Sequence, residues 1–155
     1  MANNKQPRTA VIMLNYNGEK DSLACLDALE PQTERHVVIA IDNASRDNFA
    51  SIANRDYPNT ILIKNKRNLG FSGGVNAGIR YAIDNNFDYI ALINNDALPE
   101  PGWLRELVNV LDSKPQVGIA TGKILKIDGT IDTTGDFYTT WGIPFPRGRG
   151  TKDIN

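Results

Sequence analysis

Short apolar runs alternate with helix-like stretches along most of the chain, and this alternation predicts the fold class. Four runs rich in aliphatic and β-branched residues predict buried strands over residues 9–14, 36–41, 60–63 and 89–93. Apolar residues at helical spacing predict helices over residues 18–29, 47–55, 75–85 and 101–113, with Ser45 as a candidate N-cap. Strands that alternate with helices build a mainly parallel sheet that is covered on both faces. The pattern therefore predicts an open, Rossmann-like α/β fold.

The remainder of the chain carries a weaker pattern. An extended region is expected within residues 116–127, and Asp128-Gly129 is a hairpin signal before a strand over residues 130–134. Glycine, proline and basic residues dominate after Phe137 and predict a loop or frayed tail. We therefore expect a disordered N-terminus over residues 1–8, one domain over residues 9–137 and a tail over residues 138–155.

Composition and charge exclude several classes of protein. The net charge of −1, with no basic stripe, argues against nucleic acid as a partner. The apolar runs are far shorter than a transmembrane helix of ~20 residues, and the polar N-terminus does not resemble a signal peptide. A single cysteine, Cys25, rules out an intramolecular disulfide framework. These features predict a cytoplasmic protein, with Trp141 and the basic tail as a weaker indication of contact with the inner face of the membrane.

Polar residues follow each of the four predicted strands. They are Asn15-Tyr16-Asn17, Asp42-Asn43, Asn65 with Asn68, and Asn94-Asn95-Asp96. Ligands of open α/β sheets bind outside the carboxyl ends of the strands, so these residues predict a binding site along one rim. Asn and Asp also cap helices and form turns, and the repetition at four strand ends makes the two interpretations about equally strong.

A glycine-rich segment over residues 70–78 precedes the third predicted helix. Its glycines would let the backbone approach a ligand, and the N-terminus of a helix attracts anions. Residues 118–123 look like a phosphate-binding loop, but the glycine spacing is one residue short and Ile124 stands where Ser or Thr is needed. The dinucleotide fingerprint is also missing after the first strand.

Four motifs, in this order along the chain, resemble the signatures of inverting family-2 glycosyltransferases. They are residues 11–17 (VIMLNYN), 41–47 (IDNASRD), 68–79 (NLGFSGGVNAGI), and 92–96 (LINND) followed by 101–104 (PGWL). The Asn-Asn-Asp form of the last motif is similar to the rhamnosyltransferase-like branch of the family. The resemblance covers residues 9–137 and implies a GT-A fold that is truncated on its C-terminal side.

The resemblance also implies which residues bind a nucleotide-sugar donor. Leu14, Asn15 and Tyr16 would flank the nucleobase, and Asp42 with Asn43 would hydrogen-bond the base or the ribose. Gly73, Gly74 and Asn76 would line the nucleotide pocket. Asn94 and Asn95 would lie at the ribose and diphosphate, and Asp96 would bind a divalent metal, Mg or Mn. The family's metal motif often has two carboxylates, but one carboxylate together with substrate phosphates can hold Mg²⁺.

The implied reaction transfers a sugar from a UDP- or dTDP-linked donor to a hydroxyl of a saccharide or lipid-linked acceptor. The family does this with inversion, and the resemblance places it in cell-surface polysaccharide synthesis. A carboxylate base would take the proton of the hydroxyl, but the family's segments that carry this base do not follow Phe137. We interpret the nearby carboxylates as turn and surface charges, so the catalytic residue stays unknown; these are Asp128, Asp132, Asp136 and Asp153. This chain alone is expected to bind nucleotide weakly and not to transfer sugar at a normal rate.

Two other function classes stay open. One is a non-catalytic nucleotide-binding or assembly module, which would bind the donor without turnover. The other is a nucleotidyltransferase, which would need a Gly-rich basic signature after the first strand that is lacking here. A truncated domain would also expose an apolar surface or a sheet edge, which predicts self-association into a homo-oligomer.

Overall fold

The computed structural model describes residues 8–153, and the chain divides into two compact units. The first unit is Met1–Arg105 and the second is Glu106–Asn155. The boundary falls inside residues 9–137, which we expected to form one domain, and no change of composition marks it in the sequence. The first unit contains the polar strand ends that predicted a binding site.

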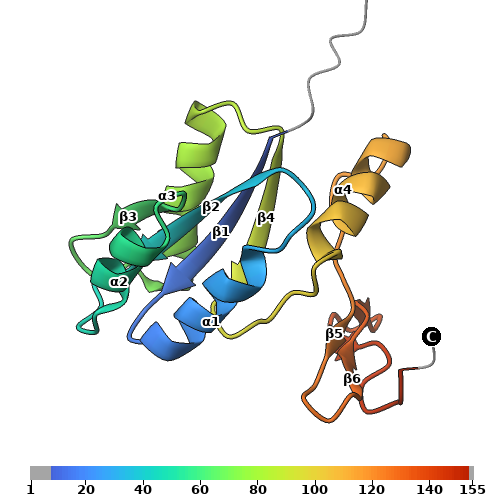
Figure 1. Ribbon diagram of the computed structural model, residues 1–155. Coiled ribbons are helices and arrows are strands. Elements are labelled where there is room, and N and C mark those ends of the chain that lie inside the picture. The colour runs from blue at the N-terminus through green and yellow to red at the C-terminus, as the bar shows by residue number, and fades with distance from the viewer. Residues whose placement is uncertain (1–7, 154–155) are drawn as a thin grey trace, which may run out of the picture. The chain divides into compact units, whose positions relative to one another are not determined.

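The first unit is built on a four-stranded parallel sheet (Figure 1). Its strands are β1 (Thr9–Asn15), β2 (His36–Asp42), β3 (Ile61–Lys64) and β4 (Tyr89–Asn94), in the order β3-β2-β1-β4. Leu14 of β1 lies opposite Ile41 of β2 and Asn94 of β4, so the carboxyl ends of these strands meet at one rim. The predicted parallel sheet is confirmed.

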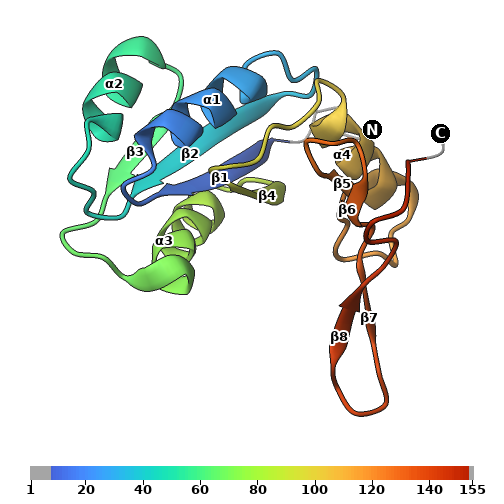
Figure 2. The same ribbon diagram turned by 90° about the horizontal axis from the view of Figure 1, so that it is seen from below.

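Helices cover both faces of this sheet, as predicted. Figure 2 shows α1 (Glu19–Leu29) and α2 (Phe49–Asp56) on one face and α3 (Gly70–Asp84) on the other. Successive side chains of a strand point to opposite faces, which explains the two apolar clusters. Val11 and Met13 pack with residues of α1 and α2, including Leu26 and Phe49. Ala10 and Ile12 pack with α3, including Val75 and Ala82. Because β1 is buried on both faces, apolar residues occupy every position from Ala10 to Leu14.

All four helices begin at residues other than those predicted, and the second and third show why. The second helix begins at Phe49 with Asn48 at its N-cap, and Ser45 instead bonds the loop that follows β1. The third helix begins at Gly70, five positions before the predicted start at Val75. Its glycines were expected to let the backbone approach a ligand, but Gly74 and Gly78 lie within the helix and are buried against the sheet.

The N-terminal expectation is corrected at one residue. Residues 1–7 lie outside the described part of the chain, whereas Arg8 is held by several contacts. Its backbone N–H donates to the Asp88 carboxylate at 2.7 Å, and its guanidinium donates to the Asn85 carbonyl at 3.2 Å. The guanidinium also lies 4.4 Å from the centre of the Phe87 ring. Arg8 therefore belongs to the folded unit.

The second unit contains two small antiparallel hairpins. The helix α4 (Trp103–Ser113) leads into it, and β5 (Ile124–Leu125) pairs with β6 (Ile131–Thr133) across the predicted Asp128-Gly129 turn. The strands β7 (Asp136–Tyr138) and β8 (Pro144–Pro146) form the second hairpin, and β8 lies in the stretch that we expected to be a loop or tail. Gly142, at φ 77°, closes its turn by donating to the Thr139 carbonyl. No helix in the described part of the chain is long and apolar enough to cross a bilayer.

Candidate functional site

A pocket opens at the carboxyl rim of the sheet, between β1 and β4. The chain adds β2 and β3 on one side of β1 and then crosses to add β4 on the other, so the strand order reverses between β1 and β4. Open α/β sheets bind their ligands at such a reversal. The pocket has a volume of about 230 Å³ and is lined by Leu14, Tyr16, Phe71, Ile93, Asn94, Asn95 and Asp96.

Two aromatic side chains form part of the pocket wall. Tyr16 follows β1 and is 50% exposed, and Phe71 lies in the first turn of α3 and is 59% exposed. Aromatic rings offer flat apolar surface, which suits a planar ligand group. We did not predict Phe71 or Ile93 as site residues. The signal for Phe71 was available, because an aromatic residue inside a glycine-rich helix start has few core partners.

The polar side of the pocket comes from the end of β4. Asn94, Asn95 and Asp96 all line it, as the resemblance implied that they would lie together. The Asn95 amide donates to the Ser22 hydroxyl at 3.0 Å. Asp96 is exposed, and among the described residues no donor bonds its carboxylate. Burial raises the pKa of the Cys25 thiol to about 12, with a smaller contribution from the charge of Asp96. Cys25 is therefore a neutral, buried thiol, and its Sγ lies 3.7 Å from the carbonyl oxygen of Asn94.

Asn15 lies at the end of β1 but is fully buried. Its Nδ2 donates to the Ser45 hydroxyl at 2.9 Å and faces the Asp47 carboxylate at 3.4 Å. Its Oδ1 accepts from the Gly18 N–H at 3.2 Å and from the Ser22 hydroxyl at 2.7 Å. A carboxamide has two donors and two acceptor positions, so all four are occupied within the protein.

Asn43 lies after the end of β2 and is equally buried and fully bonded. Its Nδ2 donates to Asn68 Oδ1 at 2.8 Å and to the Gly70 carbonyl at 3.2 Å. Its Oδ1 accepts from Asn65 Nδ2 at 3.0 Å and from the Leu69 N–H at 3.1 Å. The side chain therefore fixes the loop that joins β3 to α3, and through it the start of the helix that carries Phe71.

Asp42 and the following loop join the ends of β1 and β2. Asp42 is 8% exposed, and its Oδ1 accepts from the Ser45 N–H at 3.1 Å. Asp47 accepts from the N–H groups of Glu19 and Phe49, at 3.0 and 3.2 Å, and so caps the first turns of α1 and α2. Negative charge at these two helix N-termini is favourable for both helices.

The three expected residues of α3 do not line the pocket. A side chain at Gly74 would meet Leu14 Cδ1 at 2.5 Å, so this glycine lets the helix approach β1 closely. A Cβ added at Gly73 would lie 2.8 Å from Cβ of Leu69, the N-cap residue of the same helix. Asn76 is exposed. Of the eleven residues that the resemblance implied, the structure places five in the pocket wall: Leu14, Tyr16, Asn94, Asn95 and Asp96.

The donor set of the pocket fits a metal that arrives with its ligand. The described residues contain no cluster of three or more His, Cys, Asp or Glu side chains suited to a metal. Asp96 nevertheless offers an exposed carboxylate beside the carboxamide of Asn95. Oxygen donors of this kind suit Mg²⁺ and Mn²⁺, and Mg²⁺ often takes one or two carboxylates plus substrate phosphates. The pocket thus fits a substrate-assisted metal site rather than a site built entirely by protein.

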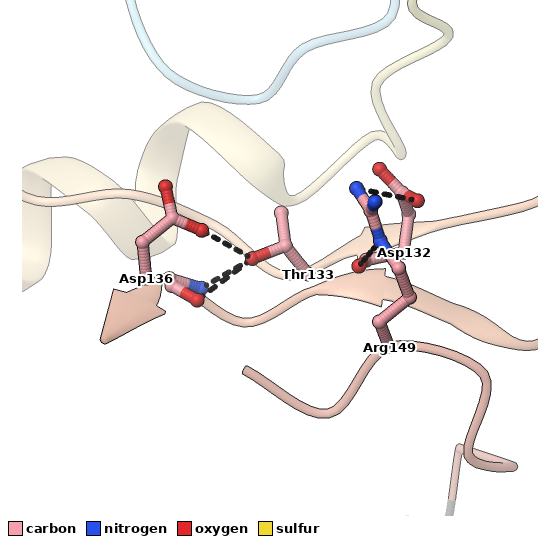
Figure 3. Close-up of polar contacts among 5 residues, drawn as sticks. Asp132, Thr133, Asp136 and Arg149 are labelled. Carbon is pink, nitrogen blue, oxygen red and sulfur yellow. Dashed lines mark hydrogen bonds and ion pairs between the residues drawn. The ribbon is translucent and has the colours of Figure 1, made fainter. Parts of the chain in front are cut away.

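The carboxylates of the second unit make local contacts. Asp132 pairs with the Arg149 guanidinium at 3.3 Å, and Asp136 accepts from the Thr133 hydroxyl at 3.4 Å (Figure 3). Asp153 pairs with Lys123 at 2.5 Å. Hydrogen bonds from the Thr130 hydroxyl and N–H lower the pKa of Asp128 below its usual value. Each of the four has a partner within its own unit, as turn and surface charges would.

Comparison with known proteins identifies a family for nearly the whole chain. The model of the family described as Glycosyl transferase family 2 matches residues 10–154. The match extends through residues 138–154, which we had separated as a tail. A comparison with curated protein sequences gives no match.

Solved structures share the fold. The mannosyltransferase PcManGT from Pyrobaculum calidifontis, in complex with GDP-Man and Mn²⁺, superposes with a TM-score of 0.68 at 24% identity, over 79% of this chain and 37% of that one. TarS from S. aureus gives a TM-score of 0.62 at 18% identity, over 77% and 40%, and its complex with UDP-GlcNAc gives 0.62 at 17%, over 76% and 40%. This chain spans about two fifths of the length of these proteins. The chain belongs to glycosyl transferase family 2 and has a GT-A fold.

Proposed function

We propose that this chain is the donor-binding part of a glycosyltransferase and that the pocket between β1 and β4 binds a nucleoside-diphosphate sugar. One observation carries the proposal. In a family-2 chain, two exposed aromatic rings and the Asn-Asn-Asp end of β4 line one pocket at the reversal of strand order. The titles of the solved neighbours support this ligand class, because PcManGT is in complex with GDP-Man and TarS with UDP-GlcNAc.

The proposed donor lies along the rim from the aromatic wall to β4. Tyr16 and Phe71 would contact the faces of the nucleobase, and Leu14 would form the apolar floor of the pocket beneath it. Asp42 would accept from a base N–H or a ribose hydroxyl, because no described group bonds its second carboxylate oxygen. Asn94 and Asn95 would lie at the ribose and diphosphate. Asn15 and Asn43 are fully bonded, so we propose that they support the loops around the donor, and Gly73, Gly74 and Asn76 support the helix.

A divalent metal, Mg or Mn, fits beside Asp96. When bound, such an ion neutralises the charge that develops on a leaving diphosphate. Asp96 would hold the ion with the phosphates of the donor, and the Asn95 carboxamide would lie next to it. The presence of Mn²⁺ in the PcManGT complex supports this choice of metal.

We propose transfer with inversion from a UDP- or dTDP-linked hexose or rhamnose to a saccharide or lipid-linked acceptor, in cell-surface polysaccharide synthesis at the cytoplasmic side of the membrane. The second candidate function is a binding or assembly module without turnover. It is favoured by the local contacts of all four carboxylates of the second unit that we considered as bases. The family match favours either of these over a nucleotidyltransferase.

Calorimetric titration tests the proposal. The purified chain is titrated with UDP, dTDP and GDP, each with and without Mg²⁺ or Mn²⁺. We expect metal-dependent binding of UDP or dTDP, and loss of the metal dependence in Asp96→Ala. Asp84→Ala, which removes an exposed carboxylate at the end of α3, is the matched control and should bind as the unaltered chain does. Binding of none of the three nucleotides under any condition contradicts the proposal.

A further inference from the structure

Ser22 connects the end of β1 to the pocket, although nothing in its sequence context marks it. It lies in the second turn of α1 and is fully buried. Its hydroxyl oxygen is 2.7 Å from Asn15 Oδ1 and 3.0 Å from Asn95 Nδ2. A single hydroxyl therefore joins a buried, fully bonded asparagine to an asparagine that lines the pocket.

One backbone group determines the direction of each hydrogen bond that links Asn15, Ser22 and Asn95. The Gly18 N–H can only donate, so the atom of Asn15 that it meets at 3.2 Å is the carbonyl oxygen. The opposite end of the Asn15 amide faces the Asp47 carboxylate, which can only accept, and this agrees with the same orientation. Ser22 must then give its one proton to Asn15, because Asn15 Oδ1 cannot donate.

The orientation of Asn95 follows from that of Ser22. With its proton given to Asn15, the Ser22 oxygen can only accept, so Asn95 must present its NH₂ group to Ser22. The Asn95 carbonyl oxygen then has no donor among the described residues, and one N–H of its NH₂ group is also left without a partner there. The pocket consequently offers two kinds of acceptor side by side, the Asn95 carbonyl and the Asp96 carboxylate.

We infer that Ser22 is a positioning residue that fixes the Asn95 carboxamide with its carbonyl toward the pocket. The inference rests on the proposed function for what binds there. The two adjacent acceptors, the Asn95 carbonyl and the Asp96 carboxylate, favour ligand groups that donate hydrogen bonds or carry positive charge, such as a hydroxyl or a divalent cation. A reversed Asn95 would present its NH₂ group instead, which can neither accept a hydrogen bond nor bind a cation.

A substitution at Gly18 can perturb the Asn95 amide without changing Ser22. A Cβ at this position would lie 2.6 Å from Asn95 Nδ2 and 3.5 Å from Asn15 Oδ1. Gly18 has φ −125°, which any residue can adopt, so an alanine here has a steric effect and no conformational one. Gly18→Ala should therefore displace the Asn95 amide while leaving the Ser22 hydroxyl in place.

The test compares Ser22→Ala, Gly18→Ala, Asn95→Ala and the double variant Ser22→Ala with Asn95→Ala. Titration with UDP, dTDP and GDP in Mn²⁺ gives the affinities. Ser22→Ala and Gly18→Ala should each weaken the binding seen in the unaltered chain by about threefold to tenfold, the equivalent of one hydrogen bond. In the Asn95→Ala background, Ser22→Ala should weaken binding by less than about a further twofold, because Ser22 acts through Asn95. An equal loss in both backgrounds, or no loss in either, overturns the inference.

A second readout does not depend on any ligand. The side-chain NH₂ signals of Asn95, assigned in NMR spectra by their loss in Asn95→Ala, should show slow hydrogen exchange in the unaltered chain and faster exchange in Ser22→Ala. Unchanged exchange of Asn95 in Ser22→Ala overturns the inference whether or not nucleotide binds. Absence of nucleotide binding by the unaltered chain, with the expected exchange difference, overturns the proposed function and leaves the role of Ser22 supported.

Discussion

Two buried asparagines hold the loops that surround the pocket. Asn15 joins the first turn of α1 to the loop after β2, and Asn43 joins the end of β2 to the loop before α3. Each carboxamide bonds both backbone and side-chain groups that would otherwise lack these partners. Because a buried polar group without a partner costs about 1–3 kcal/mol, replacing either side chain should affect more than one loop.

Asn43 allows this to be measured with a nearly isosteric change. Asn43→Asp keeps both acceptors but removes the donors to Asn68 Oδ1 and the Gly70 carbonyl, and it places a charge beside these two oxygens. We expect a loss of about 2–4 kcal/mol of unfolding free energy near pH 8. The neutral acid can donate one hydrogen bond, and burial favours it, so part of the loss should be recovered near pH 5.

Urea unfolding at the two pH values measures this effect. Asn54→Asp, on the exposed side of α2, is the control and should change stability little at either pH. Stability of Asn43→Asp equal to that of the unaltered chain at pH 8 would show that the loop does not depend on the amide.

Tyr57 predicts how the fold responds to alkali. Its hydroxyl donates to Asp27 at 2.5 Å. Burial, followed by this hydrogen bond and nearby carboxylates, raises the pKa of Tyr57 to about 12. An unfolded tyrosine ionises near pH 10, so between about pH 10 and 12 the unfolded state loses a proton that the folded state keeps. The free energy of unfolding should therefore fall as pH rises through this range.

Tyr57→Phe removes the titrating group and tests the assignment. It should be less stable by about 0.5–1.5 kcal/mol near neutral pH, because the bond to Asp27 is lost, but its stability should fall less steeply above about pH 10. Denaturant unfolding across this range gives both quantities. Parallel pH curves for the two proteins would assign the alkaline loss to other groups.

At the scale of the elements, the closest packing lies between α3 and the sheet. Gly74 and Gly78 lie one turn apart on α3 and face β1 and β2. An added Cβ at Gly78 would lie 2.8 Å from Ile12 Cγ2 and 2.9 Å from Ile41 Cδ1. Both side chains belong to the buried core, so they have little room to move.

Gly78→Ala should therefore destabilise the protein although alanine is the better helix former. The helix propensity gains about 1 kcal/mol, whereas overpacking of a buried interface costs about 1–3 kcal/mol. We expect a lower thermal midpoint for Gly78→Ala. Ser72→Ala, at an exposed position of the same helix, should be neutral or slightly stabilising. A higher midpoint for Gly78→Ala would mean that the helix can move away from the sheet at little cost.

These glycines also show where prediction from the sequence stopped. The strands and the parallel sheet followed from apolar runs, which depend on local sequence. A glycine that allows close packing cannot be told locally from a glycine in a turn, so the start of α3 was predicted at Val75 instead of Gly70. Likewise, Asn15 and Asn95 are both asparagines at the end of a strand, so the local sequence does not distinguish their roles. Only loops distant in the sequence determine that one is fully bonded and the other lines the pocket.

At the scale of the whole molecule, the sheet leaves apolar surface exposed at β4. This strand is an edge of the four-stranded sheet, and Ile90 and Leu92 are 38% and 52% exposed. An apolar edge strand can pair with another chain. The exposed edge is the basis for the self-association that we predicted.

Light scattering after size exclusion over a range of protein concentrations tests this prediction. We expect the mass of the unaltered chain to rise with concentration, because pairing through β4 would cover the side chains of Ile90 and Leu92. Leu92→Lys places a charge on this strand and should shift the population toward the monomer. Leu98→Lys changes a similarly exposed leucine outside β4, and it should associate as the unaltered chain does. If Leu92→Lys and Leu98→Lys give the same dependence of mass on concentration, the contact between chains lies outside β4. If the unaltered chain has the mass of a monomer at every concentration, the exposed edge of β4 does not pair.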